Sequence, residues 1–123
     1  MTNPRHSLGL AAEDAVAVWL SACGWRLVAR RHRSTDGGEV DLVALDPTRV
    51  LVAIEVRARR TMRNGAAAAS VDQRRIGRLG RSLASIAASC GEAHEGLRID
   101  LVTAEPAADQ PGRWRLRRIP GIG

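Results

Sequence analysis

Lysine, phenylalanine and tyrosine are absent from this sequence of 123 residues, and its aromatic residues are the tryptophans Trp19, Trp25 and Trp114. Proteins that read single-stranded RNA stack the bases on exposed aromatic rings, so this composition disfavours that mode of recognition. The sequence also lacks a run of about 18 apolar residues, which excludes a membrane-spanning helix. Its first residues contain no apolar signal segment, and we therefore expect a cytoplasmic protein.

Cysteine is also scarce, and the two cysteines, Cys23 and Cys90, stand far apart. Neither belongs to a CxxC motif or to a Cys/His pattern with ligand spacing, so a zinc site is disfavoured and we expect two reduced thiols. The length fits one compact domain over residues 1–123.

The charge balance is strongly positive, with a net charge of +6 and an isoelectric point of about 11.3. All 19 basic residues are arginines. A compositional bias of the source genome explains the absence of lysine, but it does not explain the positive excess. Because arginine is always protonated and grips phosphate with a planar fork, we expect a nucleic-acid partner.

The pattern of apolar residues predicts a mixed-sheet α/β domain flanked by helices. Helical spacing predicts a first helix from Ser7 to about Cys23, ended by Gly24. Ser70 and Gln73 have the spacing of a capping box, which predicts a second helix from there to about Ser89. Small, unpatterned residues before it predict a mobile loop over 61–69. Strands are predicted over residues 25–33, 39–45, 50–59, 97–102 and 114–119.

Two acidic residues, Asp41 and Glu55, lie inside neighbouring predicted strands, where a charged side chain is costly to bury. If Leu45 pairs with Leu51, Asp41 lies opposite Glu55, whereas a one-residue slip would place the two on opposite faces. Carboxylates about 5 Å apart form an all-oxygen site suited to Mg²⁺ or Mn²⁺. Such an ion can lower the pKa of bound water and neutralise charge on a scissile phosphate.

Two other interpretations of these acidic residues stay open. Ion pairs of Glu39 with Arg57 and of Glu55 with Arg59 explain the same residue types without a metal. Glu13 points partly toward the buried side of the first helix and could support a metal site. The helix dipole also favours a glutamate in a first turn, which on physical grounds is the preferred interpretation of Glu13.

The second predicted helix carries several arginines beside its apolar face, at positions 74, 75, 78 and 81. Such a face is usually only solvated. Because this helix is expected close to the acidic strands, contacts with phosphates are an equally good interpretation.

Six segments together resemble the YraN family of bacterial proteins, in the right order and spacing from about Leu8 to Val102. They are Gly9–Glu13, Gly24–Trp25, Gly38–Val43, Ile54–Arg59, Gly65–Val71 and Arg98–Val102. The family is grouped by fold with the PD-(D/E)xK nucleases and is similar to archaeal Holliday junction resolvases. The resemblance implies a restriction-endonuclease-like α-β-β-β-α-β core.

The resemblance also implies roles for individual residues. Asp41 and Glu55 would bind Mg²⁺ or Mn²⁺, and Glu13 would be the helical carboxylate. Arg57 would take the position of the catalytic lysine, and the basic helix position would fall on Gln73 or Arg75. Arginine cannot act as a base near neutral pH, so Arg57 would position a phosphate instead.

We therefore expect a nucleic-acid-binding protein with a divalent-metal-dependent nuclease site that acts on duplex or branched DNA. Nucleic-acid contacts are expected at Arg59, Arg74, Arg75 and Arg78, with Glu39 and Gln73 in support. A symmetric substrate favours a homodimer. The alternatives are a non-catalytic nucleic-acid-binding or assembly module that kept the nuclease fold, and an RNA-associated factor.

Overall fold

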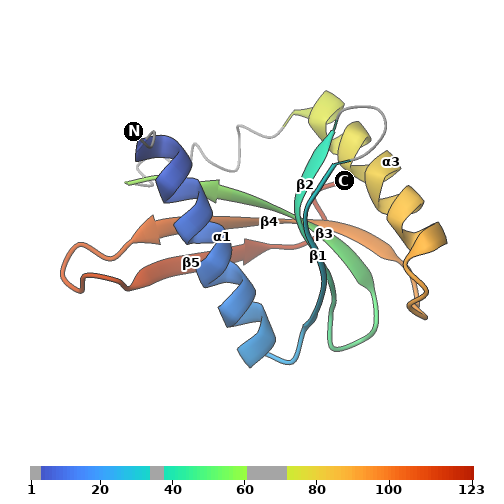
Figure 1. Ribbon diagram of the computed structural model, residues 1–123, viewed down its shortest axis with the longest axis horizontal. Helices are drawn as coiled ribbons and strands as arrows, with labels where there is room; N and C mark the ends of the chain where they lie inside the picture. Colours follow the sequence, from blue (N-terminus) through green and yellow to red (C-terminus); the bar gives the residue numbers. More distant parts are fainter. Residues whose placement is uncertain (1–3, 34–37, 61–71) are drawn as a thin grey trace.

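The computed structural model describes residues 4–33, 38–60 and 72–123, with side chains from Ser7 onward (Figure 1). Its elements follow the order expected from the sequence, so the α/β class is confirmed. They are α1 (Pro4–Ala22), β1 (Arg26–Arg33), β2 (Glu39–Leu45), β3 (Leu51–Ala58), α3 (Gln73–Ser89), β4 (Leu97–Pro106) and β5 (Trp114–Ile119).

The five strands form one mixed sheet in the order β1-β2-β3-β4-β5. The pairs β1–β2, β2–β3 and β4–β5 are antiparallel, whereas β3 and β4 are parallel. Parallel neighbours need a crossover connection, and α3 lies in the connection between β3 and β4.

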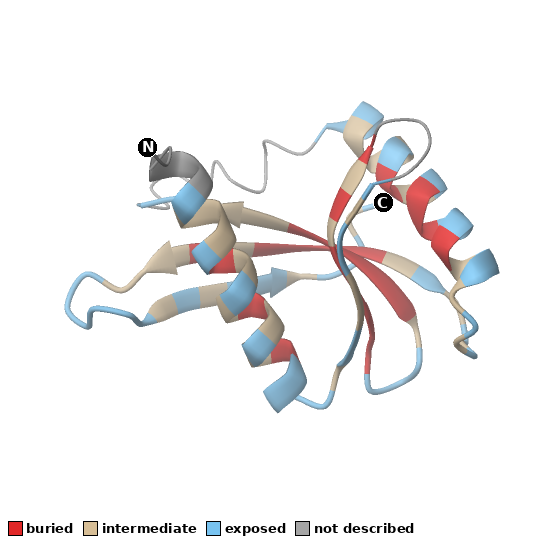
Figure 2. Ribbon diagram, in the orientation of Figure 1, coloured by how far each residue is buried: buried red, intermediate tan, exposed pale blue. Residues whose placement is uncertain are grey.

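Alternate residues of the central strands enter two separate hydrophobic cores, one on each face of the sheet. On one face, Leu51 and Ala53 pack with Leu79, Leu83 and Ile86 of α3. On the other face, the core contains Val52 and Ile54 of β3 together with Val16 and Leu20 of α1. Figure 2 shows the resulting buried centre of the sheet. Both faces of the sheet are covered, and β3 accordingly carries buried apolar residues on both sides.

Both helices begin at residues other than those predicted from the sequence. Helix α1 begins at Pro4 rather than Ser7, and α3 begins at Gln73 with Asp72 as its N-cap. Ser70, the predicted cap, lies outside the described residues, as does the predicted loop over 61–69. The Asp72 carboxylate accepts a hydrogen bond of 2.8 Å from the Arg75 backbone N–H, so it satisfies a free donor of the first turn.

Strand β4 continues to Pro106, beyond its predicted end at Val102, because β5 pairs with it. Near its start, the fully buried Asp100 accepts hydrogen bonds from Arg98, Arg118 and the backbone N–H of Gly121. This buried network ties the C-terminal segment to the sheet, and the sequence pattern did not indicate it.

Candidate functional site

Strands β2 and β3 bring Asp41 and Glu55 together through the register that the sequence allowed. The paired residues run from Leu45 opposite Leu51 to Leu42 opposite Ile54, so Asp41 and Glu55 are the next residues along the two strands. The Asp41 carboxyl accepts a hydrogen bond of 2.8 Å from the Val56 backbone N–H. Its side chain therefore lies against β3, and it also hydrogen-bonds the Glu55 side chain.

Glu55 is 2% exposed, and Arg75 of α3 is its cationic partner. The Arg75 Nε donates to one Glu55 carboxylate oxygen, and Nη2 donates to the other at 3.0 Å. The resemblance placed the basic helix position on Gln73 or Arg75, and Arg75 is the one that lies against Glu55. The turn of α3 that Asp72 caps carries Arg75 toward the sheet.

The pKa values of the two carboxyl groups are shifted in opposite directions. Burial, the hydrogen bond to Glu55 and the charge of Glu55 raise the pKa of Asp41 to about 8. Burial alone would raise the pKa of Glu55 as well, but the hydrogen bonds from Arg75 and Asp41 outweigh it and lower that pKa. Near neutral pH the pair thus holds one proton, and Asp41 carries it.

Glu13 lies in the same neighbourhood, because its charge contributes to the raised pKa of Asp41. Its side chain is 13% exposed and accepts a hydrogen bond of 3.0 Å from the Nε of Arg31. Arg31 has a φ of 47°, an uncommon value for an arginine, so the chain holds it in a strained conformation. Glu13 stands in the middle of α1, so its interpretation as a first-turn residue is wrong.

The described residues contain no group of three or more His, Cys, Asp or Glu side chains that could hold a metal ion. The acidic donors of the site are therefore Asp41 and Glu55, while Glu13 is held by Arg31.

The acidic residues of the ion pairs suggested as the alternative to a metal have other partners. Glu39 pairs with Arg33 at 3.4 Å, and Glu55 pairs with Arg75. The half-buried Arg57 lowers the pKa of Glu55 through its charge, and its Nε has no hydrogen-bond partner within the described structure. A buried donor without a partner is costly, which makes Arg57 available to an acceptor from outside the chain.

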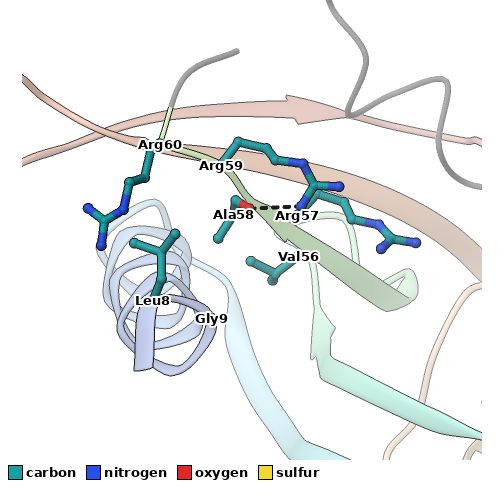
Figure 3. Close-up of a pocket in the computed structure, with 7 residues that line it drawn as sticks. All are labelled: Leu8, Gly9, Val56, Arg57, Ala58, Arg59 and Arg60. Atoms are coloured by element: carbon teal, nitrogen blue, oxygen red, sulfur yellow. Dashed lines mark hydrogen bonds between the residues drawn. The ribbon is translucent and has the colours of Figure 1, made fainter. Parts of the chain in front are cut away.

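The remaining predicted contact residues surround this centre at different depths. Gln73, Arg74 and Arg78 are exposed on α3. Arg59 is exposed at the end of β3, where its Nη1 donates to the Ala58 carbonyl at 3.0 Å (Figure 3). Only Arg75 of the predicted α3 contacts reaches the acidic pair among the described hydrogen bonds.

The family model of the uncharacterised protein family UPF0102 matches residues 12–104 of this sequence. The chain belongs to the UPF0102 family. A UPF0102 protein of Deinococcus radiodurans is 38% identical over 114 residues, which cover 92% of this chain and 91% of that protein. The UPF0102 protein STH1475 of Symbiobacterium thermophilum is 39% identical over 112 residues, covering 91% of this chain and 92% of that protein.

A third relative, the UPF0102 protein BAV3162 of Bordetella avium, is 41% identical over 112 residues, which are 91% of this chain and 74% of that protein. These matches confirm the YraN-like resemblance at the level of the family. In this UPF0102 protein, no helix of the described part of the chain is long and apolar enough to cross a membrane.

Proposed function

We propose that this UPF0102 protein binds nucleic acid and hydrolyses phosphodiester bonds with a divalent metal at Asp41 and Glu55, on a restriction-endonuclease-like core. The observation that carries the proposal is the convergence of these two acids from paired strands, beside Arg57. Together they offer oxygen ligands for a cation and a guanidinium for a phosphate.

The donor set fits Mg²⁺ or Mn²⁺, because both are hard ions that prefer oxygen ligands. Mg²⁺ keeps several waters when it binds, so two protein carboxylates are enough when a substrate phosphate supplies a further oxygen. When bound, the ion would neutralise charge on the phosphate and acidify water.

The residues of the chain itself have separate tasks in this proposal. Arg57 directs its free Nε–H to the phosphate and stabilises the negative charge that develops there. Arg75 fixes the orientation of Glu55 through two hydrogen bonds. Duplex and branched DNA present two equivalent strands, so we include a homodimer in the proposal, which sedimentation velocity would detect.

A non-catalytic nucleic-acid-binding module is the second candidate, and one observation favours it. Arg75 bonds both oxygens of Glu55, and a proton neutralises Asp41, so the pair is stable without a metal. Such a site could be a relic of a nuclease fold that now serves only binding.

Calorimetric titration with Mg²⁺ and with Mn²⁺ tests the metal site directly. We expect binding to the wild type and to Asp109→Asn, an exposed control on the β4–β5 turn, and loss of binding in Asp41→Asn and Glu55→Gln. Absence of binding to the wild type, or equal binding to Asp41→Asn, would exclude the metal site.

Cleavage assays on four-way junctions, flaps and linear duplexes then separate the two candidates. The nuclease proposal predicts cleavage by the wild type, its loss in Glu55→Gln and its retention in Arg57→Lys, because lysine keeps the positive charge. If the wild type and Glu55→Gln bind DNA equally well and neither cleaves any substrate, the binding module is the correct function.

A further inference from the structure

A hollow of about 620 Å³ lies between α1 and the end of β3 (Figure 3), on the α1 face of the sheet, and its strand lining begins one residue after Glu55. Its lining residues come from one turn of the helix and from the end of the strand with the two residues beyond it. They are Leu8, Gly9, Val56, Arg57, Ala58, Arg59 and Arg60. The hollow adjoins the site itself, because Val56 lines it and donates its backbone N–H to Asp41.

The walls of this hollow differ in chemistry. The side chains of Leu8, Val56 and Ala58 form its apolar part between helix and strand (Figure 3). Arg60 extends beside Leu8 on the α1 side, whereas Arg57 and Arg59 extend to the other side of the strand end (Figure 3). Such a site suits a ligand that combines an apolar surface with negative charge.

The three arginines are free to meet such a ligand. Among the described residues, no carboxylate lies within ion-pair distance of Arg57, Arg59 or Arg60. The hydrogen bond of Arg59 goes to the carbonyl of its neighbour, Ala58. On the α1 side of the hollow, Arg60 therefore lacks a described carboxylate partner, and a phosphate would neutralise its charge (Figure 3).

Gly9 supplies an independent observation. It lies inside α1, where glycine is among the least favourable residues. Close packing does not explain it, because a Cβ at this position would meet no described atom within 4 Å outside its own stretch of helix. The missing side chain leaves the hollow open.

We propose that this hollow binds one nucleotide unit of the substrate strand, next to the phosphate that reaches Asp41 and Glu55. The apolar wall would contact the sugar and base, and Arg60, on the α1 side, would bind the phosphate of that nucleotide. This inference rests on the proposed function, since it assumes a nucleic-acid substrate, but it does not require cleavage or a metal.

Filling the hollow is the sharpest test, and α1 provides a matched pair of variants. Gly9→Leu places a side chain in the hollow without changing the charge, whereas Ala11→Leu adds one at an exposed position of the same helix. Affinity for a short 3′-labelled duplex is measured by fluorescence anisotropy in EDTA. We expect Gly9→Leu to weaken binding by about tenfold or more and Ala11→Leu to bind like the wild type.

A second pair of variants keeps the test decisive if Gly9→Leu fails to fold by circular dichroism. Arg60→Gln should weaken binding about tenfold through one lost charged contact, and Arg113→Gln, at the β4–β5 turn, should weaken it less. Equal affinities within each folded pair would overturn the nucleotide site.

The source of the phosphate is resolved by comparing duplexes with and without a 5′-phosphate. A 5′-phosphate that strengthens binding to the wild type but not to Gly9→Leu identifies a strand end in the hollow. If Gly9→Leu loses the same affinity for both duplexes, the hollow binds an internal nucleotide. If the wild type binds neither duplex, the proposed function falls together with this site. If the wild type binds and Gly9→Leu binds equally, only this site falls.

Discussion

The proton shared by Asp41 and Glu55 controls the response of this site to pH. The pKa of Asp41 lies at about 8 in the folded chain, against an ordinary value of 3.8 for an aspartic acid side chain. Between these values the folded chain holds a proton that the unfolded chain has released. The contribution of Asp41 to stability is therefore complete below about pH 4 and is lost as the pH rises through 8.

Asp41→Asn should remove this dependence, because an amide can accept from the Val56 N–H and donate to Glu55 at every pH. We expect the free energy of unfolding of the variant, relative to that of the wild type, to increase as the pH rises from 5 to 8, by up to about 1.4 kcal/mol per pH unit. Urea unfolding at a series of pH values measures the difference. A constant difference across this range, or the same trend in Asp109→Asn, would contradict the assignment of the proton.

Replacement of Arg75 should leave the acidic pair without its cationic partner. In Arg75→Met, the nearly buried Glu55 keeps its desolvation penalty but loses its cation. We expect destabilisation of about 3 kcal/mol by urea unfolding. Because a divalent ion could replace the lost charge, Mn²⁺ should raise the melting temperature of this variant more than that of the wild type. An equal shift in both proteins would count against a metal at these acids.

At the scale of elements, the sequence predicted those features that depend on local residue pattern and on strand register. The span of β2, and the pairing that places Asp41 beside Glu55, follow from alternating apolar residues and a short turn. The partners of these acids come from elsewhere in the chain. Arg75 reaches Glu55 from a helix on the other side of a crossover, and Arg31 reaches Glu13 through an unusual backbone conformation. Neither contact has a sequence period that could reveal it.

The first turn of α3 offers two candidate N-caps in the sequence. Ser70 with Gln73 and Asp72 with Arg75 both have cap spacing, and the acceptor that bonds the helix is Asp72. Asp72→Ala should cost about 1 kcal/mol in the free energy of unfolding, whereas Ser70→Ala should leave it unchanged. Chemical denaturation of the two variants decides between the caps. A larger loss in Ser70→Ala would show that the helix begins earlier.

At the scale of the whole molecule, a net charge of +6 attracts any polyanion, so binding alone says little about orientation. Arg74 and Arg78 are exposed on α3, the helix that brings Arg75 to the acids. Arg113 and Arg115 are exposed at the β4–β5 hairpin, at the far end of the molecule from α3 (Figure 1). Replacing either pair lowers the net charge equally, so the two double variants separate specific contacts from general attraction.

The salt dependence of DNA binding should distinguish the two faces. Each phosphate contact contributes about 0.9 to the slope of log K against log salt concentration. If DNA lies along α3, the double variant Arg74→Gln/Arg78→Gln should reduce that slope by nearly 2, because each arginine neutralises one phosphate. Arg113→Gln/Arg115→Gln should reduce it less, since the proposed phosphate contacts lie on α3 and at the end of β3 rather than on the hairpin. Equal reductions would mean that the α3 arginines make no specific phosphate contacts, and a larger reduction in the hairpin variant would place the DNA on the β4–β5 hairpin.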